Sequence, residues 1–399
     1  MFLLGRAEKR RFNIRLSATF REEIEREALR VALKRTAQQY PLFFVRFHVG
    51  WSRMYCEPVS SLPEIETMQR SEMLRLPEQH ECEARVECEG NRLTLTYFHG
   101  VTDGSGGLTV FVHLITEYLA QKSGDMRALC GLPAIPISEQ AEDGYRRLGR
   151  GFRLEARRDV PCRIVGTPTD GETITSYLLS VEAVKRCAGA QQASVSEWLS
   201  AIFCIAVADL RQAFPERVAP GKVRLTVPVD LRRRFPCRTL HNFTLNVYPE
   251  FDPEQGGRAL PILCTKLRRY MERATARDQL AGRCASSALA SGIWPVRLAP
   301  VALKRWIVRR SLDAPHAAST LTFSNIGAVR LSEAMRKEVA RLSFAFSTKP
   351  EAPYSCGVIS AGDRLCLSLT RAIREPVLEA WLEALLKQFD IHYEKWDEG

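Results

Sequence analysis

A single histidine stands at the start of a glycine-rich segment, TYFHGVTDGSGG, at residues 96–107. The segment begins within RLTLTYF, an alternating run typical of a strand. Its last two glycines begin GGLTVFVHLITEYLAQK, whose apolar residues have helical spacing. His99 is therefore expected at a strand end facing a cleft, where an imidazole can act as a general base near neutral pH. The glycines would allow close approaches that larger residues resist. From these residues alone, an ordinary loop histidine without chemistry explains the segment equally well.

Asp103 lies four residues after His99 and has two alternative roles. It could orient the imidazole, or it could face away and brace the loop. A helix N-terminus lowers the pKa of a nearby histidine and a carboxylate raises it, so the net direction for His99 stays open. For the brace, we expect Arg232 in PVDLRRRF as the partner, because arginine pairs with carboxylates directionally. Among other histidines, His113 is predicted to be a core residue and His241 is left open.

Other motifs that would explain the glycines are absent from the sequence. There is no GxxxxGK[ST], GxGxxG or GxSxG pattern, which argues against phosphate-loop, dinucleotide-binding and esterase functions. The 12 cysteines include no CxxC pair. We predict no metal site, and we expect buried free thiols in a reducing compartment.

Length and composition indicate a globular protein of two domains or one large unit. The chain has 399 residues, of which 45% are hydrophobic and 26% charged. Its formal charge of +11 favours acidic partners such as a phosphate-bearing co-substrate or an acidic carrier protein. The basic residues are spread along the chain without an RNA-binding or zinc-finger signature, so we predict no nucleic-acid partner.

The sequence predicts a cytoplasmic location. The apolar run in MFLLGRAEKRR is too short for a signal peptide, and no stretch of about 18 apolar residues occurs. The segment WPVRLAPVALKRWIVRR would allow weak peripheral contact with an anionic membrane surface, although Pro295 and Pro300 interrupt it.

Hydrophobic periodicity predicts an α+β fold in two halves. We divide the chain into a first domain at 1–122, a Gly-, Pro- and Arg-rich linker at 123–170 and a second domain at 171–399. Ser194 and Glu197 have capping-box spacing ahead of an apolar helix. Strands are expected at 10–20, 41–50, 52–59, 81–89, 92–98, 173–180, 222–229, 242–251, 319–324, 342–347, 355–360 and 364–370. Helices are expected within 21–40, 106–122, 181–190, 194–214, from about Arg258, and within 375–389, where a helix closes the chain.

The run HGVTDG resembles the HxxxDG signature of the condensation-domain and CoA-dependent acyltransferase superfamily. TAQQYPLFFVRFHVGWSRMY is similar to an early segment of the bacterial alcohol acetyltransferase group. VPVDLRRRFPCRTLHNFTLNV and TFSNIGAV resemble two later segments of the superfamily, at Pro228, Asp230–Arg232, Asn242–Phe243, Ser324–Asn325 and Gly327. The matching segments follow one another over nearly the whole chain.

This resemblance implies two similar chloramphenicol-acetyltransferase-like lobes, an α/β sandwich around a central tunnel. His99 would be the general base, with Asp103 and Gly104 completing the motif. Loop bracing and tunnel positions would be Arg232, Asn242, Ser324 and Asn325. The implied reaction moves an acyl group from acyl-CoA, a co-substrate and not a permanently bound cofactor, to a small-molecule alcohol or amine.

The sequence departs from the superfamily in two ways. Phe98 replaces the first histidine of the two that condensation domains usually carry, and the DFGWG motif of plant-type members is absent. Two alternatives therefore stay open: a free-standing condensation-type enzyme whose donor rides on an acyl-carrier protein, and a catalytically inactive binding or scaffold member.

Basic residues of the second half are the candidates for binding the phosphates of acyl-CoA. They lie in KLRRYMERATARDQLAGR and LKRWIVRR, and we name Lys266, Arg268, Lys304 and Arg305. A solvated basic helix face explains the same stretches equally well.

Overall fold

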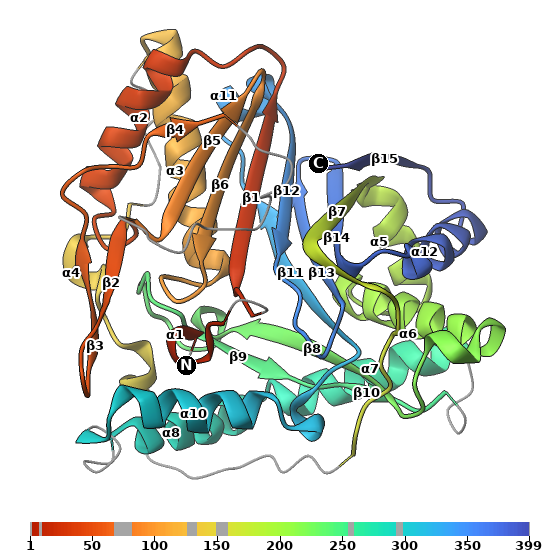
Figure 1. The fold of residues 1–399 in the computed structure, drawn as a ribbon. Coiled ribbons are helices and arrows are strands. Elements are labelled where there is room, and N and C mark those ends of the chain that lie inside the picture. The colour runs from red at the N-terminus through yellow and green to blue at the C-terminus, as the bar shows by residue number, and fades with distance from the viewer. Residues whose placement is uncertain are drawn as a thin grey trace.

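The structure is a computed structural model that describes residues 2–7, 10–67, 82–125, 134–148, 159–253, 259–292 and 298–398. Residues 126–133 and 149–158 of the predicted linker, Cys130, Pro295 and Arg258 lie outside the described residues. The described chain forms two large mixed sheets covered by helices (Figure 1), which confirms the predicted α+β class. No single helix in the described ranges has both the length and the apolar composition to cross a bilayer, although one bent pair, 181–190 with 195–213, meets those criteria together.

The first sheet has five strands in the order β12-β1-β6-β5-β4. Its strands are β12 (Val339–Phe346), β1 (Asn13–Phe20), β6 (Arg92–Phe98), β5 (Ala84–Glu89) and β4 (Ile65–Glu66). Helices α2 (Arg26–Gln39) and α3 (Gly104–Ser123) cover one side of it (Figure 1). Their apolar faces and the inner side chains of the sheet form one buried core, which includes His113.

The second sheet has eight strands, in the order β10-β8-β11-β13-β14-β7-β15 with β9 paired to β8. These are β10 (Glu250–Phe251), β8 (Val223–Asp230), β11 (Leu321–Val329), β13 (Tyr354–Ala361), β14 (Arg364–Ile373), β7 (Pro168–Ser180), β15 (Tyr393–Asp397) and β9 (Thr244–Val247). Helices α5 (Val181–Ala190), α6 (Val195–Ala213), α7 (Leu260–Ala274) and α12 (Val377–Gln388) pack on it. Strand β15 follows α12, so the expectation that a helix closes the chain is wrong.

Helix α6 lies at the centre of the second core and begins at the predicted capping box. Ser194 Oγ accepts a hydrogen bond from the Glu197 backbone N–H at 3.3 Å, and Glu197 Oε2 accepts one from the Ser194 N–H at 2.8 Å. The helix is buried on nearly all sides, as its almost uninterrupted apolar sequence requires.

The two halves of the sequence share the first sheet. Strand β12 comes from the second half, yet it pairs antiparallel with β1, with Leu342 opposite Ala18. The next strand, β13, enters the second sheet, and Ser355 Oγ at its start still donates to the Phe346 carbonyl oxygen at 2.7 Å. The two sheets therefore diverge between β12 and β13.

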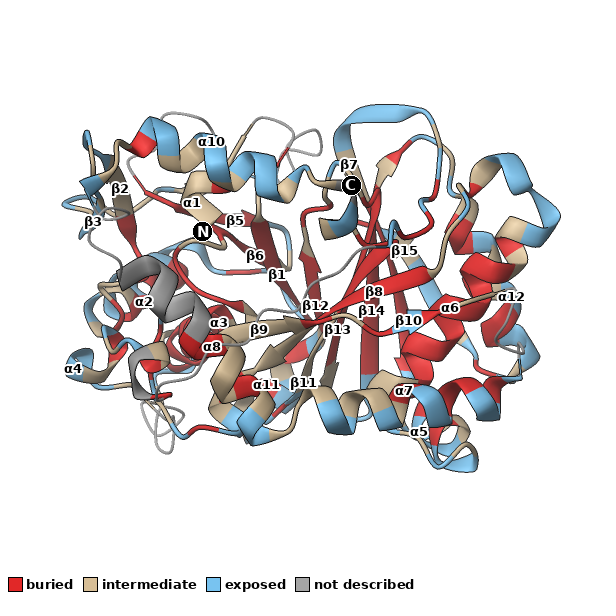
Figure 2. Cartoon of the chain, turned by 90° about the horizontal axis from the view of Figure 1, so that it is seen from below, coloured by how far each residue is buried: buried red, intermediate tan, exposed pale blue. Residues whose placement is uncertain are grey.

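Smaller elements lie around the opening between the sheets. They include α1 (Phe2–Gly5), the hairpin β2 (Val45–Val49) and β3 (Met54–Pro58), α8 (Arg277–Gly292) and α10 (Val301–Leu312). In the view from below, α10 lies beside α1 and the hairpin (Figure 2). The other short elements are α4 (Ile137–Gln140), α11 (Glu333–Glu338) and 3₁₀ turns at Gly144–Arg147, Pro215–Arg217, Leu231–Arg233 and Pro315–Ala317.

All described cysteines are free thiols, as predicted. Most are buried, but Cys56 is exposed, and Cys187 and Cys237 are half-buried.

Candidate active site

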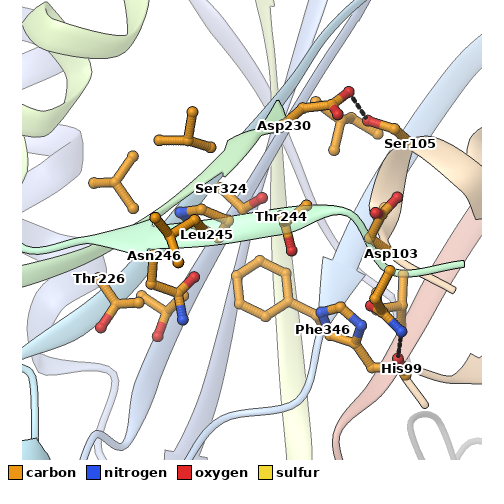
Figure 3. Close-up of a pocket in the computed structure, with 18 of the residues that line it drawn as sticks. His99, Asp103, Ser105, Thr226, Asp230, Thr244, Leu245, Asn246, Ser324 and Phe346 are labelled. Atoms are coloured by element: carbon orange, nitrogen blue, oxygen red, sulfur yellow. Dashed lines mark hydrogen bonds between the residues drawn. The ribbon is translucent and has the colours of Figure 1, made fainter. Parts of the chain in front are cut away.

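A cavity of about 990 Å³ opens between the two sheets and is lined by both halves of the chain. The first half supplies α1, the start of β1 and the loop from β6 to α3. The second half supplies β8, β9, β11 and β12. His99, Asp103, Ser324 and Phe346 are among the lining residues (Figure 3). The cavity volume is at the upper end of what small-molecule sites usually have.

His99 stands directly after the last residue of β6 and is fixed by two backbone contacts. Its N–H donates to the Phe12 carbonyl oxygen at 2.8 Å. Its ring Nδ1 lies 3.1 Å from the Thr102 carbonyl oxygen, which can only accept, so Nδ1 carries the hydrogen. The neutral ring therefore has its lone pair on Nε2, the arrangement that a general base needs.

The N-terminal helix α1 covers the imidazole of His99. The Phe2 ring stacks on it with centroids 4.1 Å apart and planes 18° apart, and Phe2 meets Phe12 edge-on at 5.3 Å. Burial of the imidazole disfavours its charged form and lowers the pKa of His99 below the ordinary histidine value, although the charge of Asp103 acts in the opposite direction. The histidine is thus held neutral in the pH range where a base is useful.

Asp103 is turned away from the imidazole and is saturated with hydrogen bonds. Its side chain is 1% exposed. Oδ1 accepts from the Gly106 N–H at 2.9 Å, which caps α3, and Oδ2 accepts from the Phe243 N–H at 2.7 Å and from Arg232 at 2.8 Å. Of the two roles open from the sequence, this geometry favours bracing.

Arg232 completes this brace from the second half of the chain. Its guanidinium also donates to Asp230 at 3.1 Å, to the Thr239 carbonyl at 3.1 Å and to the His241 carbonyl at 2.7 Å. Ser105 adds a second link between the halves, because its hydroxyl donates to Asp230 Oδ2 at 2.8 Å (Figure 3). The loop that carries His99 is therefore locked to the second lobe by charge-assisted bonds.

The glycine at position 106 is required by a close approach, not by backbone conformation. A Cβ at Gly106 would overlap the Thr102 hydroxyl and lie 3.0 Å from the Leu240 carbonyl oxygen. The Thr102 hydroxyl itself donates to that same carbonyl. Gly104, one of the predicted motif residues, is the first residue of α3 and lines the cavity.

The structure brings the other predicted tunnel residues to the cavity wall. Asn242 donates its side-chain N–H to the His99 carbonyl at 2.8 Å, which helps to hold the loop. Asn325 donates to Ser196 Oγ at 3.0 Å and accepts from the Gly327 N–H at 2.8 Å, so it shapes the bend of β11. Ser324 lines the cavity beside it.

The four predicted phosphate-binding cations do not line the cavity. Lys266 is exposed on α7, and Arg268 donates to the Gln191 carbonyl at 3.2 Å. Lys304 donates to the Ser52 carbonyl at 2.6 Å, and Arg305 is on α10 next to it. The basic residues that do line the cavity are Arg233, Arg234, Arg283 and Lys349. Arg283 lies within the predicted stretch KLRRYMERATARDQLAGR, although it was not one of the four named residues, whereas Arg233, Arg234 and Lys349 lie outside both predicted stretches. Charge density along a helix carries no information about which of its residues meets a cavity.

Two further residues were missed by sequence reasoning. Phe2 is 97 positions from His99, and nothing in the local sequence connects them. Thr226 on β8 is 2% exposed, and its hydroxyl has no hydrogen-bond partner among the described residues. In the view of Figure 3, Thr226 and Asn246 lie across the cavity from His99, with Phe346 between them. A buried hydroxyl without a partner is uncommon in folded proteins, so Thr226 is a notable feature of the cavity wall.

Comparison with solved structures places this architecture among known folds. F. sporotrichioides TRI101 complexed with coenzyme A and T-2 matches with a TM-score of 0.64 over 98% of each chain at 12% identity. The epimerization domain from the third module of tyrocidine synthetase B matches with a TM-score of 0.63 at 12% identity, over 96% of this chain and 91% of that one. A mutant starter condensation domain of rhizomide synthetase, in complex with C8-CoA and Leu-SNAC, gives 0.57 at 13% identity, over 97% and 90%.

The chain therefore has the two-lobed fold found in TRI101, in this epimerization domain and in this condensation domain. No family model matches the sequence, and no curated protein matches it.

Proposed function

We propose that this protein is an acyltransferase that moves an acyl group from a thioester donor to an alcohol or amine, with His99 as general base. The observation that carries the proposal is the state of His99. Its Nδ1–H is bound to the Thr102 carbonyl, its pKa is lowered by burial, and it lines a cavity between two lobes. The fold, shared with TRI101 in complex with coenzyme A and with condensation domains, supports the same reaction class.

The reaction follows from this geometry in two proton transfers. Nε2 of His99 takes the proton from the acceptor O–H or N–H as that atom attacks the thioester carbonyl carbon. The C–S bond then breaks, and the imidazolium returns the proton to the leaving thiolate. The acyl group ends on the acceptor and a free thiol is released, without a covalent enzyme intermediate. General-base assistance of this kind is worth about 10² to 10⁴ in rate.

We infer that acyl-CoA is the donor. The basic residues Arg233, Arg234, Arg283 and Lys349 at the cavity would neutralise its phosphates in place of the four cations predicted from the sequence. The unpartnered hydroxyl of Thr226 would bind an amide or hydroxyl of the donor arm or of the acceptor.

An acyl-carrier protein is the second candidate donor, because the fold matches condensation domains as well as TRI101. Parallel kinetics with acyl-CoA, acyl-pantetheine and an acyl-carrier protein separate the two. A CoA-dependent enzyme should use acyl-pantetheine with a higher KM and a similar kcat if the nucleotide stabilises the bound substrate and the transition state equally. A carrier-dependent enzyme should prefer the acyl-carrier protein by a wide margin.

Mass spectrometry of the products from mixed acyl-CoAs with alcohols and amines tests the proposed function. We expect an acylated acceptor to appear together with free CoA. Release of CoA without an acylated product would mean that the protein only hydrolyses thioesters. If no donor reacts over a broad acceptor panel, the result would favour a binding or scaffold protein.

A further inference from the structure

Helix α10 presents apolar side chains to solvent. Leu303, Trp306 and Ile307 are 46%, 63% and 53% exposed. Their spacing of three and four residues places them on one face of the helix, together with Arg310. Val301, at the opposite face, is buried. The helix thus packs inward with one face and carries an unpartnered apolar stripe on the other, which a purely structural surface helix does not require.

The tip of the β2–β3 hairpin adds another exposed apolar side chain next to the start of α10. Trp51 at the tip is 76% exposed. Its carbonyl accepts from the Val301 N–H at 2.7 Å, and the Ser52 carbonyl accepts from Lys304 Nζ at 2.6 Å. The tip is therefore fixed against the first turn of α10, and Figure 2 shows the largely exposed α10 next to the hairpin. We call Trp51, Leu303, Trp306 and Ile307 the α10 face.

Basic residues of α10 and the hairpin border the α10 face. The helix VALKRWIVRRSL contains Lys304, Arg305, Arg309 and Arg310 and no acidic residue. Arg309 and Arg310 are exposed, as is Arg53 in the hairpin. The nearest carboxylate along the chain, Asp313, is paired with Arg10 at 2.9 Å.

We propose that the α10 face docks on the surface of an anionic lipid bilayer. Exposed tryptophans and aliphatic residues bordered by arginines are what an interfacial helix needs, since the apolar side chains enter the headgroup boundary while the cations meet lipid phosphates. A second copy of this chain fits less well. A two-fold interface brings the same patch against itself, and here it would oppose arginines to arginines.

Docking would place the cavity next to the membrane. Helix α1 packs on α10, where a Cβ at Gly5 would lie 2.7 Å from Leu312 Cδ1. Phe2 and Leu3 of α1 and Phe47 of the hairpin line the cavity. A substrate with an apolar chain could then pass from the bilayer to His99 without crossing bulk water. This last step rests on the proposed acyl transfer, whereas the docking itself does not.

Co-sedimentation of the full chain with lipid vesicles tests the proposal. We expect binding to phosphatidylcholine vesicles that contain phosphatidylserine, weaker binding to phosphatidylcholine alone, and loss of binding as salt rises. The double variant Trp306→Ser, Ile307→Ser should reduce partitioning by about tenfold or more, because each side chain loses its apolar transfer into the interface. The variant Arg309→Gln, Arg310→Gln should lose the preference for phosphatidylserine.

Ile262→Ser provides the matched control. Ile262 is 49% exposed on α7, a helix that also carries several basic residues, and its substitution should leave vesicle binding unchanged. Unaltered thermal unfolding shows that each variant is folded.

The proposal is overturned if the wild-type chain stays in the supernatant with phosphatidylserine vesicles, or if Ile262→Ser weakens binding as much as the double variant. A dimer in solution that the double variant dissociates, without vesicle binding, would assign the face to a second copy instead. Because the readout is sedimentation, the result does not depend on whether acyl transfer is observed.

Discussion

In the proposed reaction, the protonation state of His99 decides whether its ring can accept a proton from the acceptor. His99 stacks under the Phe2 ring; burial lowers the pKa of His99, and the charge of Asp103 acts in the opposite direction. Phe98, which replaces the first motif histidine, is fully buried against Arg6, whose guanidinium lies 4.4 Å from its ring centre. Phe98 therefore stabilises the loop by packing and supplies no second base.

The pH dependence of turnover should report this burial. A base with a lowered pKa stays neutral to lower pH, so kcat/KM of the wild-type enzyme should decline only below the ordinary histidine value of about 6.5. Phe2→Ala exposes the imidazole, which raises the pKa of His99 and moves the acidic limb upward. Leu3→Ala, which removes a cavity residue without a ring contact to His99, is the control. An acidic limb that is unmoved in Phe2→Ala would show that Phe2 does not tune His99.

The brace at Asp103 should contribute to stability as well as to rate. Asp103→Asn leaves Arg232 without one buried charged partner, and we expect a loss of about 3 kcal/mol in the free energy of unfolding. Asp230→Asn should cost less, because Asp230 is more exposed and shares the same arginine. Urea unfolding of both variants measures the difference. Equal stability of Asp103→Asn and wild type would contradict the bracing role.

At the level of elements, the start of α3 depends on tight packing between Gly106 and Thr102. Gly106→Ala should destabilise the protein by about 2 kcal/mol, because the new methyl group overlaps the Thr102 hydroxyl. In a chain that also carries Thr102→Ala, the same substitution should cost less, since the overlapping atom is gone. A double-mutant cycle from urea unfolding measures this coupling. Purely additive effects would mean that the contact does not limit the packing.

The sequence predicted most elements and only part of the site. Strands and long helices follow from hydrophobic spacing, and Ser194 with Glu197 marked the start of α6. Helix α1 and strand β15 were missed because their sequences are short or highly charged and their stability comes from tertiary partners. The stacking of Phe2 on His99 and the place of Thr226 on the cavity wall also depend on tertiary packing, so the sequence does not show them. His99, Asp103 and Arg232 were predicted because they stand in or near a recognisable motif.

At the scale of the whole molecule, one strand of the second half, β12, completes the sheet of the first half. Strand β12 pairs with β1 along Ile14–Phe20, and Glu398 near the C-terminus is bonded both to Arg92 of the first half and to Ser176 of the second. The predicted domain boundaries at 1–122 and 171–399 thus separate residues that form one sheet.

We therefore expect a fragment of residues 1–122 to fail to fold alone. Without β12, the buried strand β1 becomes an open edge with unpaired backbone groups. Circular dichroism should show no cooperative unfolding for this fragment, and co-expression with residues 123–399 should restore a soluble complex. Cooperative unfolding of the isolated fragment would instead support an independent first domain.

Acyl transfer by His99 is tested most directly by comparing His99→Ala with the wild-type chain, using one acyl-CoA and one acceptor that the wild type acylates. Product is measured by mass spectrometry and donor binding by calorimetry. We predict that kcat falls by about 10² to 10⁴, with donor affinity and thermal unfolding nearly unchanged, because the substitution removes the base from a cavity that is otherwise intact. If His99→Ala turns over as fast as the wild type, His99 is not the general base.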